Sequence, residues 1–214
     1  KSIFPIESGD KWLAQYVYLH RQSNARSMVI AYYENGTFLT SVTRESSFGS
    51  LNYGGLNYHN GNVYFTDSDW SDALVTFYEY DLSETAITLQ REVTSSLRDV
   101  EGYRQSVKET GNIVINNGKI YSQHGWVFDL DSLEVVDSFP SREAVYSFNT
   151  NRMYDFHHKM STYSLSTGYK LREVADSSTS TENTIRKAIL SENSVILFEA
   201  NTIKRIGKYS FRIQ

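Results

Sequence analysis

The stretch Glu79-Tyr80-Asp81-Leu82-Ser83 decides the fold because its pattern, an aromatic residue followed by a short polar turn, recurs along the chain. The related stretches are Tyr32-Tyr33-Glu34-Asn35-Gly36, Val127-Phe128-Asp129-Leu130-Asp131, Thr162-Tyr163-Ser164-Leu165-Ser166 and Lys208-Tyr209-Ser210. Anchored on Tyr33, Tyr80, Phe128, Tyr163 and Tyr209, the repeats follow one another at steps of 47, 48, 35 and 46 residues. A period in this range is typical of stacked or radial repeats.

Within each repeat the sequence predicts short strands that end at Asn-Gly or Ser-rich turns. In the second repeat we expect strands at 51–58, 62–66, 74–81 and 87–93, with a loop at 67–72. Four antiparallel strands in 35–48 residues are typical of the blade of a β-propeller. We therefore expect an all-β fold, a β-propeller of about five four-stranded blades. The expected blades of this single domain, residues 1–214, are 1–45, 46–97, 98–141, 142–181 and 182–214.

One blade can be compared with known repeat families. The segment Gly118-Lys119-Ile120-Tyr121 and its continuation from Trp126 to Val136 resembles blades of the YVTN, quinoprotein-like and WD40-like propellers, in which a strand ends in an aromatic residue and Asp before a turn. The resemblance covers all five repeats in outline. The Gly-His and Trp-Asp signatures of WD40 repeats are absent, so the resemblance implies a fold and no function.

The last repeat is incomplete, since only residues 211–214 follow its third expected strand. Three explanations remain open from the sequence. The ring closes at five blades with one blade incomplete, or Ile3–Ile6 supplies the missing outer strand, or the chain is part of a larger propeller and its partner is the remainder of a longer polypeptide. An uncovered sheet edge would favour the third explanation.

Composition restricts the classes of function. The chain of 214 residues has a formal net charge of −4, a pI near 5.8 and no dense basic cluster, so nucleic acid is not expected as a partner. The absence of cysteine excludes disulfides, thiolate catalysis and Cys-based zinc sites. No apolar run approaches 18 residues, and we expect no membrane insertion. The single glycosylation sequon is Asn35-Gly36-Thr37, in an expected tight turn.

The loops between the second and third strands of each repeat hold the candidate binding residues. Equivalent loops of a propeller lie on one face, and loops on a rigid scaffold commonly carry binding groups. Four of the five histidines, two of the three tryptophans and an acidic cluster fall in these loops. The candidate binding residues are His20, Arg21, Asp67, Asp69, Trp70, Asp72, His124, Trp126, His157 and His158. Trp70 is the strongest candidate, because Trp126 opens a strand and could pack between blades.

Metal binding has only weak support in the sequence. Asp67, Asp69 and Ser71 occupy the first, third and fifth positions of an EF-type calcium loop, but Asp72 stands where the loop needs Gly. A solvated acidic loop therefore fits this stretch better than a calcium site. We expect no cofactor, with calcium as the alternative.

These observations favour a non-enzymatic binding module that recognises a protein or a glycan through one loop face, in a secreted, periplasmic or cell-surface setting. No Gly-x-Ser-x-Gly elbow or phosphate loop is present, and no catalytic residue is assigned. One alternative is a polysaccharide-acting propeller hydrolase or lyase that uses carboxylates among Asp67, Asp69, Asp155 and Glu199. The other is a scaffolding segment of a larger propeller protein.

Overall fold

The computed structural model describes residues 2–6, 9–19, 26–45, 54–69, 72–99, 110–141, 144–155, 160–174, 185–190, 194–199 and 203–207. The side chains of residues 2, 18, 19, 26, 99, 160 and 172–174, and of those from 185 onward, lie outside this description. The chain divides into two compact units. The first comprises residues 1–122 and 126–138, and the second residues 123–125 and 139–214.

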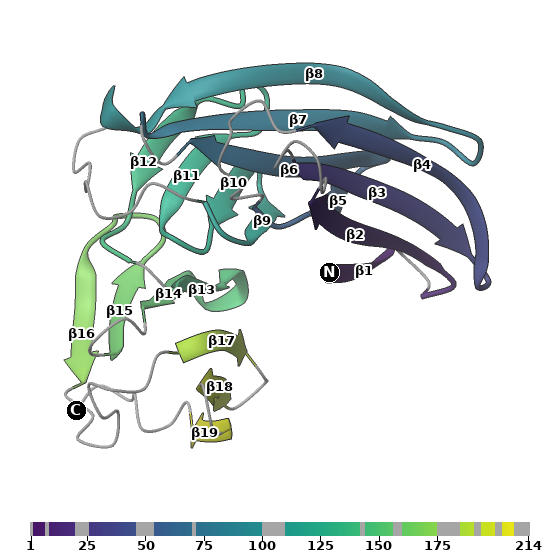
Figure 1. Ribbon diagram of the computed structural model, residues 1–214. Coiled ribbons are helices and arrows are strands. Elements are labelled where there is room, and N and C mark those ends of the chain that lie inside the picture. The colour runs from purple at the N-terminus through teal and green to yellow at the C-terminus, as the bar shows by residue number, and fades with distance from the viewer. Residues whose placement is uncertain are drawn as a thin grey trace. The chain divides into compact units, whose positions relative to one another are not determined.

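The described elements form five antiparallel sheets, each of them a meander in chain order (Figure 1). The first unit holds three sheets. The first sheet contains β1 (Ser2–Ile6), β2 (Lys11–Leu19), β3 (Arg26–Glu34) and β4 (Thr37–Glu45), and the second contains β5 (Asn57–His59), β6 (Asn62–Asp69), β7 (Leu74–Leu82) and β8 (Ile87–Ser96). The third contains β9 (Ile113–Asn116), β10 (Lys119–Ser122), β11 (Trp126–Asp129) and β12 (Val135–Ser138). The second unit holds β13 (Ala144–Ser147), β14 (Arg152–Asp155), β15 (Met160–Ser164) and β16 (Lys170–Val174), then the three strands β17 (Ile185–Leu190), β18 (Ser194–Glu199) and β19 (Ile203–Gly207). Two 3-10 turns, Leu97–Asp99 and Phe148–Thr150, complete the described elements. The all-β prediction is confirmed.

The recurring aromatic residue has a structural reason. In every four-stranded sheet of the described chain the pairing between the third and fourth strands shifts by one residue at the anchor, namely at Tyr33, Tyr80, Phe128 and Tyr163. Such a β-bulge bends the strand and increases its twist. The repeat seen in the sequence is therefore a repeat of the same bulge at the same place in each sheet.

The fifth repeat follows a different register. Its second strand begins at Ser194, and the next residue, Val195, pairs with Ile206. The corresponding pairs in the earlier sheets are those that contain the anchors, such as Val63 with Tyr80. Ile206 is thus the structural counterpart of the anchors, whereas Tyr209 lies outside the described residues. The alternative use of residues 3–6 as the outer strand of the fifth sheet is wrong, because Ser2–Ile6 is the innermost strand of the first sheet.

Apolar side chains pack between consecutive sheets of the first unit. Leu13, Ile30 and Tyr32 of the first sheet meet Phe65 and Tyr80 of the second, and all five are buried. A second cluster joins the second and third sheets and contains Tyr64, Val75, Phe77, Ile113, Ile120, Trp126 and Phe128. A four-stranded sheet of this size cannot bury both faces alone, so its stability depends on its neighbours.

The innermost strands hold the sheets together at one edge. In the first unit β1 contacts β5 and β5 contacts β9, and in the second unit β13 contacts β17. Gly55 donates its backbone N–H to the Gly111 carbonyl oxygen at 2.8 Å. Gly54 is packed so closely that an added Cβ would lie 1.9 Å from Thr66 Oγ1. The Gly-Gly pair therefore permits close backbone packing between sheets.

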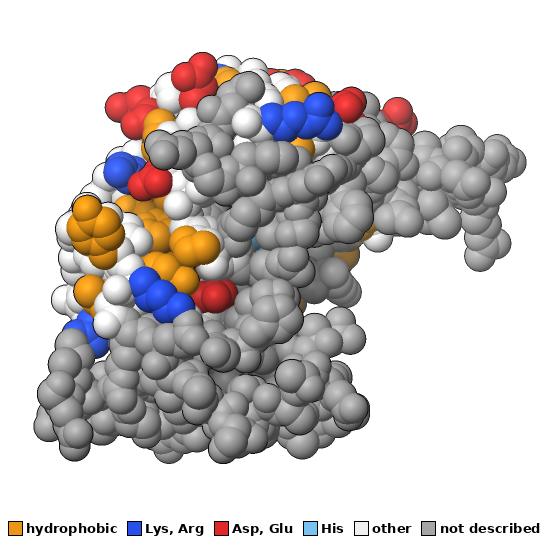
Figure 2. All heavy atoms as spheres, turned by 90° about the vertical axis from the view of Figure 1, so that its left-hand side faces the viewer, with side chains coloured by type: hydrophobic (Ala, Val, Ile, Leu, Met, Phe, Trp, Pro, Cys, Tyr) orange, Lys and Arg blue, Asp and Glu red, His pale blue; other side chains and the backbone are white. Residues whose placement is uncertain are grey.

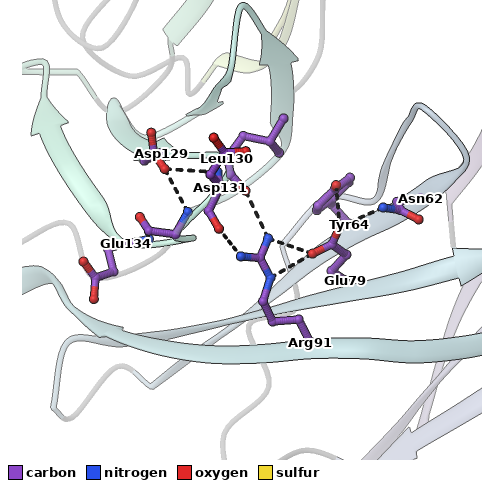
Figure 3. A network of polar contacts seen from close by, with 9 residues as sticks. Asn62, Tyr64, Glu79, Arg91, Asp129, Leu130, Asp131 and Glu134 are labelled. Carbon is purple, nitrogen blue, oxygen red and sulfur yellow. Dashed lines mark hydrogen bonds and ion pairs between the residues drawn. The ribbon is translucent and has the colours of Figure 1, made fainter.

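Arginines of the outer strands link neighbouring sheets of the first unit. Arg91 of β8 donates Nε to Glu79 Oε2 at 2.9 Å, and its guanidinium also donates to the carbonyl oxygens of Leu130 and Asp131 in the third sheet's turn (Figure 3). The other Glu79 oxygen accepts from Asn62 at 2.7 Å and from the Tyr64 hydroxyl at 2.8 Å. Burial raises the pKa of Tyr64, which keeps its hydroxyl a donor. The negative charge of Glu79 is thus balanced by Arg91, and both of its carboxylate oxygens accept hydrogen bonds.

Candidate functional site

The end of the second sheet at which β6 leads into β7 differs from the expected loop. We predicted a solvated acidic loop over residues 67–72, but β6 continues to Asp69, with Asp67 paired to Thr76 and Asp69 to Leu74. Asp67 is fully buried, so the prediction that it is solvated is wrong. Strand pairing therefore extends through these polar positions, and Ser68 between the two aspartates pairs with Val75.

In the second and third sheets, an equivalent backbone hydrogen bond holds the connection between the second and third strands. Ala73 precedes β7, has a φ of 55° and accepts a hydrogen bond from the Leu97 N–H at 2.9 Å. Gly125 precedes β11, has a φ of 87° and accepts from the Phe139 N–H at 2.7 Å. Leu97 and Phe139 each follow a fourth strand and are buried. The end of each sheet at which its second strand leads into its third is called its loop end below, and in these two sheets the loop end is held by a backbone hydrogen bond.

Glycine at position 125 is required by its surroundings. A Cβ there would lie 2.5 Å from the Phe139 carbonyl oxygen, closer than side chains tolerate. The Ala144 N–H also donates to the Gln123 carbonyl at 2.6 Å, so both neighbours of His124 are fixed through their backbone. The half-buried His124 therefore lies in a three-residue connection whose other two residues are held by backbone hydrogen bonds.

Charged groups of opposite sign meet at the loop end of the second sheet. Asp72 Oδ1 lies 3.9 Å from Arg98 Nη2, and the two side chains are 65% and 52% exposed. Asp69, the last residue of β6, is half-buried. An exposed pair of this kind contributes little to stability. Both charges of the pair lie at the surface. Figure 2 shows acidic and basic side chains interspersed over the described surface of the side it presents.

The tryptophan that opens β11 belongs to the core. Trp126 is fully buried in the cluster between the second and third sheets, and its backbone N–H donates a hydrogen bond to Ser122 Oγ at 2.9 Å. In this structure neither Trp126 nor the buried Asp67 offers surface to a ligand. Of the candidate residues, Asp69, Asp72 and His124 retain accessible surface.

Half of the candidate binding residues cannot be placed. His20, Arg21, Trp70, His157 and His158 lie outside the described residues, as does Ser71 of the calcium pattern. In the described part of the chain no group of three or more His, Cys, Asp or Glu side chains could hold a metal ion. In the same part no helix is long and apolar enough to cross a membrane.

Two of the carboxylates considered for hydrolysis, Asp155 and Asp67, belong to different compact units. Asp155, which is 7% exposed at the end of β14, accepts a hydrogen bond from Ser141 Oγ at 2.7 Å. Asp67 lies within β6 of the other unit, and the Glu199 side chain lies outside the described residues. The 2.7 Å hydrogen bond gives Asp155 a local structural role, because it links β14 to Ser141, which precedes β13.

Sequence reasoning missed three residues of the loop end: Ala73, Leu97 and Arg98. Gly125 gave a recognisable turn signal, but alanine rarely adopts a positive φ and gives none. The pairing of Arg98 with Asp72 spans 26 positions and follows no local spacing rule. A comparison of the two repeats around Gly125 and Ala73 could have found the equivalence, since each residue directly precedes a third strand.

Comparisons with known proteins reach the level of the fold. No protein-family model matches the chain, and the search of curated proteins found no match. A chain of the solved "Crystal Structure of Mitotic Checkpoint Complex" superposes with a TM-score of 0.52 at 10% identity, over 89% of this chain. This chain spans about 60% of that chain's length. The "AfRom2 CNH domain" gives a TM-score of 0.37 at 10% identity, over 95% of this chain and 92% of that one.

The first of these likenesses, together with the four-stranded meanders, identifies the fold as all-β and propeller-like. The second lies below the level at which a common fold can be argued. At 10% identity neither likeness transfers an activity, because one fold supports many unrelated functions.

Proposed function

We propose that this chain is a non-enzymatic interaction module and that a protein partner docks on the loop end. The observation that carries the proposal is the equivalent anchoring of the loop end in two sheets, from Leu97 to Ala73 and from Phe139 to Gly125. A surface held rigid by its backbone loses little conformational entropy when a partner binds. The similar chain comes from a structure described as a complex, which supports the same class of function.

The proposed contact surface combines accessible charge with aromatic and imidazole groups. Asp72 and Arg98 provide exposed charges of both signs, which would give specificity and orientation more than affinity. We assign the central contact to Trp70, because tryptophan is enriched among the residues that dominate binding energy. His20, Arg21, His124, His157 and His158 complete the proposed set. We also propose that the repeats belong with the YVTN, quinoprotein-like and WD40-like blades and that the setting is extracytoplasmic.

The proposal is tested by affinity purification with quantitative mass spectrometry on matched variants. Trp70→Ala and Asp72→Ala alter the loop end, whereas Glu84→Ala removes an exposed carboxylate from the turn at the opposite end of the same sheet. Proteins bound by the unaltered chain should be retained by Glu84→Ala and lost by Trp70→Ala. The free energy of unfolding of Trp70→Ala should change by no more than about 0.5 kcal/mol, as for a surface site.

Two results would contradict the proposal. Equal loss of partners in Asp72→Ala and Glu84→Ala would show that the loop end has no special part in binding. A large destabilisation by Trp70→Ala would show that this ring belongs to the core. Binding of immobilised oligosaccharides in place of proteins, lost in the same loop-end variants, would assign the surface to a glycan.

A further inference from the structure

The turn between β3 and β4 combines exposure with a fixed backbone. Asn35 and Gly36 have φ values of 50° and 77°, and the closing residues Glu34 and Thr37 pair directly across the hairpin. Two positive φ values in a two-residue loop are typical of a type I′ turn, which favours Asn-Gly. The Asn35 N–H donates to the Asp10 carbonyl at 2.8 Å, and Asn35, Gly36 and Thr37 are all exposed.

Two other Asn-Gly turns of the chain have the same backbone form. Asn60 and Asn117 both have a φ of 49°, and each is followed by a glycine with positive φ. The residue after the glycine is Asn62 in one turn and Lys119 in the other, so neither turn has a hydroxyl two positions after the asparagine. Only the turn at Asn35 forms the acceptor pattern Asn-x-Ser/Thr, and it is the single such pattern in the sequence.

We propose that Asn35 is an N-glycan acceptor. The co-reactant is an oligosaccharide carried on a lipid diphosphate. Asn35 Nδ2 forms a bond to the anomeric carbon of the first sugar while the bond between that carbon and the diphosphate oxygen breaks. The lipid diphosphate leaves with the electron pair, and the amide nitrogen loses one proton. The product is a surface glycan, a modification that adds bulk and solubility.

The surroundings of Asn35 suit an attached sugar. Tyr33 and Phe38 are paired across the hairpin next to the turn, and their rings meet edge to face at 5.7 Å. Phe38 is 54% exposed, and Trp12 stacks on the other side of this group at 4.0 Å from Tyr33. A flat aromatic ring offers an apolar surface that the C–H face of a sugar can cover. A glycan at Asn35 would therefore shield an aromatic surface that is otherwise open to solvent.

The position leaves the proposed protein-binding surface uncovered. β3 runs from Arg26, beside the loop end of the first sheet, to Glu34 at the opposite end. Asn35 thus lies one full strand away from the second-to-third-strand connection of its own sheet. Glycosylation and partner binding can therefore be tested and refuted separately.

The experiment expresses the full chain with a secretion leader and a tag that carries a reporter sequon, in a host that performs N-glycosylation. Only molecules whose reporter is glycosylated are scored, by intact mass and by peptide mapping. Variants Asn35→Gln and Thr37→Ala remove the acceptor and the hydroxyl. Lys119→Thr, at an exposed position, places a second acceptor pattern on a turn of the same form.

The expected result is a glycan on Asn35 in the unaltered chain and none there in Asn35→Gln or Thr37→Ala. Peptide-N-glycosidase should remove it and convert Asn35 to aspartate. An unmodified Asn35 in reporter-positive molecules would overturn the proposal, whatever Lys119→Thr shows.

Discussion

The two interfaces of the first unit are packed alike but linked differently. Between the first and second sheets, Arg44 bonds to Glu92, and its guanidinium carbon lies 4.1 Å from the centre of the Tyr78 ring. Between the second and third sheets, Arg91 neutralises Glu79 and reaches two carbonyl oxygens of the next sheet. The Glu92 side chain is 39% exposed and that of Glu79 only 12%. Arginine therefore contributes more to the interface between the second and third sheets than to the interface between the first and second.

The largest expected effect concerns what both interfaces share, their apolar packing. Phe128 is fully buried and contacts the Phe77 ring edge to face at 4.5 Å. Phe128→Ala should lower the free energy of unfolding by about 3–5 kcal/mol, since the cavity adds to the lost transfer energy. Urea denaturation measures the change, with Phe128→Leu as the milder control. A loss below about 1 kcal/mol would show that the anchor aromatic residues do not hold the sheets together.

The difference between the interfaces is tested by their arginines. Arg91→Ala leaves a nearly buried carboxylate without its cation, and we expect a cost of about 2–3 kcal/mol after allowance for the partial exposure of Arg91. Arg44→Ala leaves Glu92 open to water and removes one cation–π contact, so the free energy of unfolding should fall by about 1 kcal/mol. Denaturation of both variants under the same conditions gives the comparison.

A second substitution separates charge from packing. Adding Glu79→Gln to Arg91→Ala should recover part of the loss, because the unpaired buried charge is removed. Equal costs for the two arginines, or no recovery in the double variant, would contradict the distinction between the interfaces.

A smaller effect arises in the turn that Arg91 contacts. The backbone N–H groups of Ser132 and Asp131 hydrogen-bond Asp129 Oδ1 at 2.8 and 3.0 Å, and these bonds hold the pKa of Asp129 below its usual value. A carboxyl group whose pKa falls on folding adds stability above its unfolded pKa, near 3.9, and that stability is lost as the pH falls through the lower folded value. The stability difference between the unaltered chain and Asp129→Asn should therefore be present at pH 7 and shrink below about pH 4. Denaturation at a series of pH values measures it, and a pH-independent difference would contradict the assignment.

The smallest expected effect is at the loop end. Asp72→Ala and Arg98→Ala remove the members of an exposed pair, so each should change the free energy of unfolding by less than about 0.5 kcal/mol. Thermal unfolding in low and high salt checks this. A loss above about 1 kcal/mol would mean that the pair supports the fold, as Arg91 does, and is not reserved for a partner.

Local patterns were sufficient to locate most strands. The expected strands at 62–66, 74–81 and 87–93 correspond to β6, β7 and β8, and each begins at the predicted residue. Asn-Gly turns and period-2 alternation define such short strands within their own sequence. The innermost strand of the second sheet is shorter than expected among its described residues and begins at Asn57. Before it, the Gly55 N–H donates to the Gly111 carbonyl, outside the second sheet.

Long-range features could not be predicted from one sequence. The anchor aromatic residues were found, but the bulge that explains them requires the register of a neighbouring strand. Asp67 looked solvated beside Asp69 and Ser71, yet pairing with Thr76 buries it. Glu92 lies 48 positions from Arg44, and the Asp131 carbonyl lies 40 positions from Arg91, where no spacing rule links a cation to its partner.

Hydrogen–deuterium exchange of the chain alone and in complex with its captured protein partner would test the central claim most directly. The account predicts new protection at residues 66–69, 72–74 and 97–99, at the loop end of the second sheet, and at residues 123–125, at the loop end of the third. The turns at 83–86 and 116–119, at the opposite end, should exchange equally in both states. Protection confined to those turns, or to the outer strands β8 and β12, would contradict the assignment of the binding surface to the loop end.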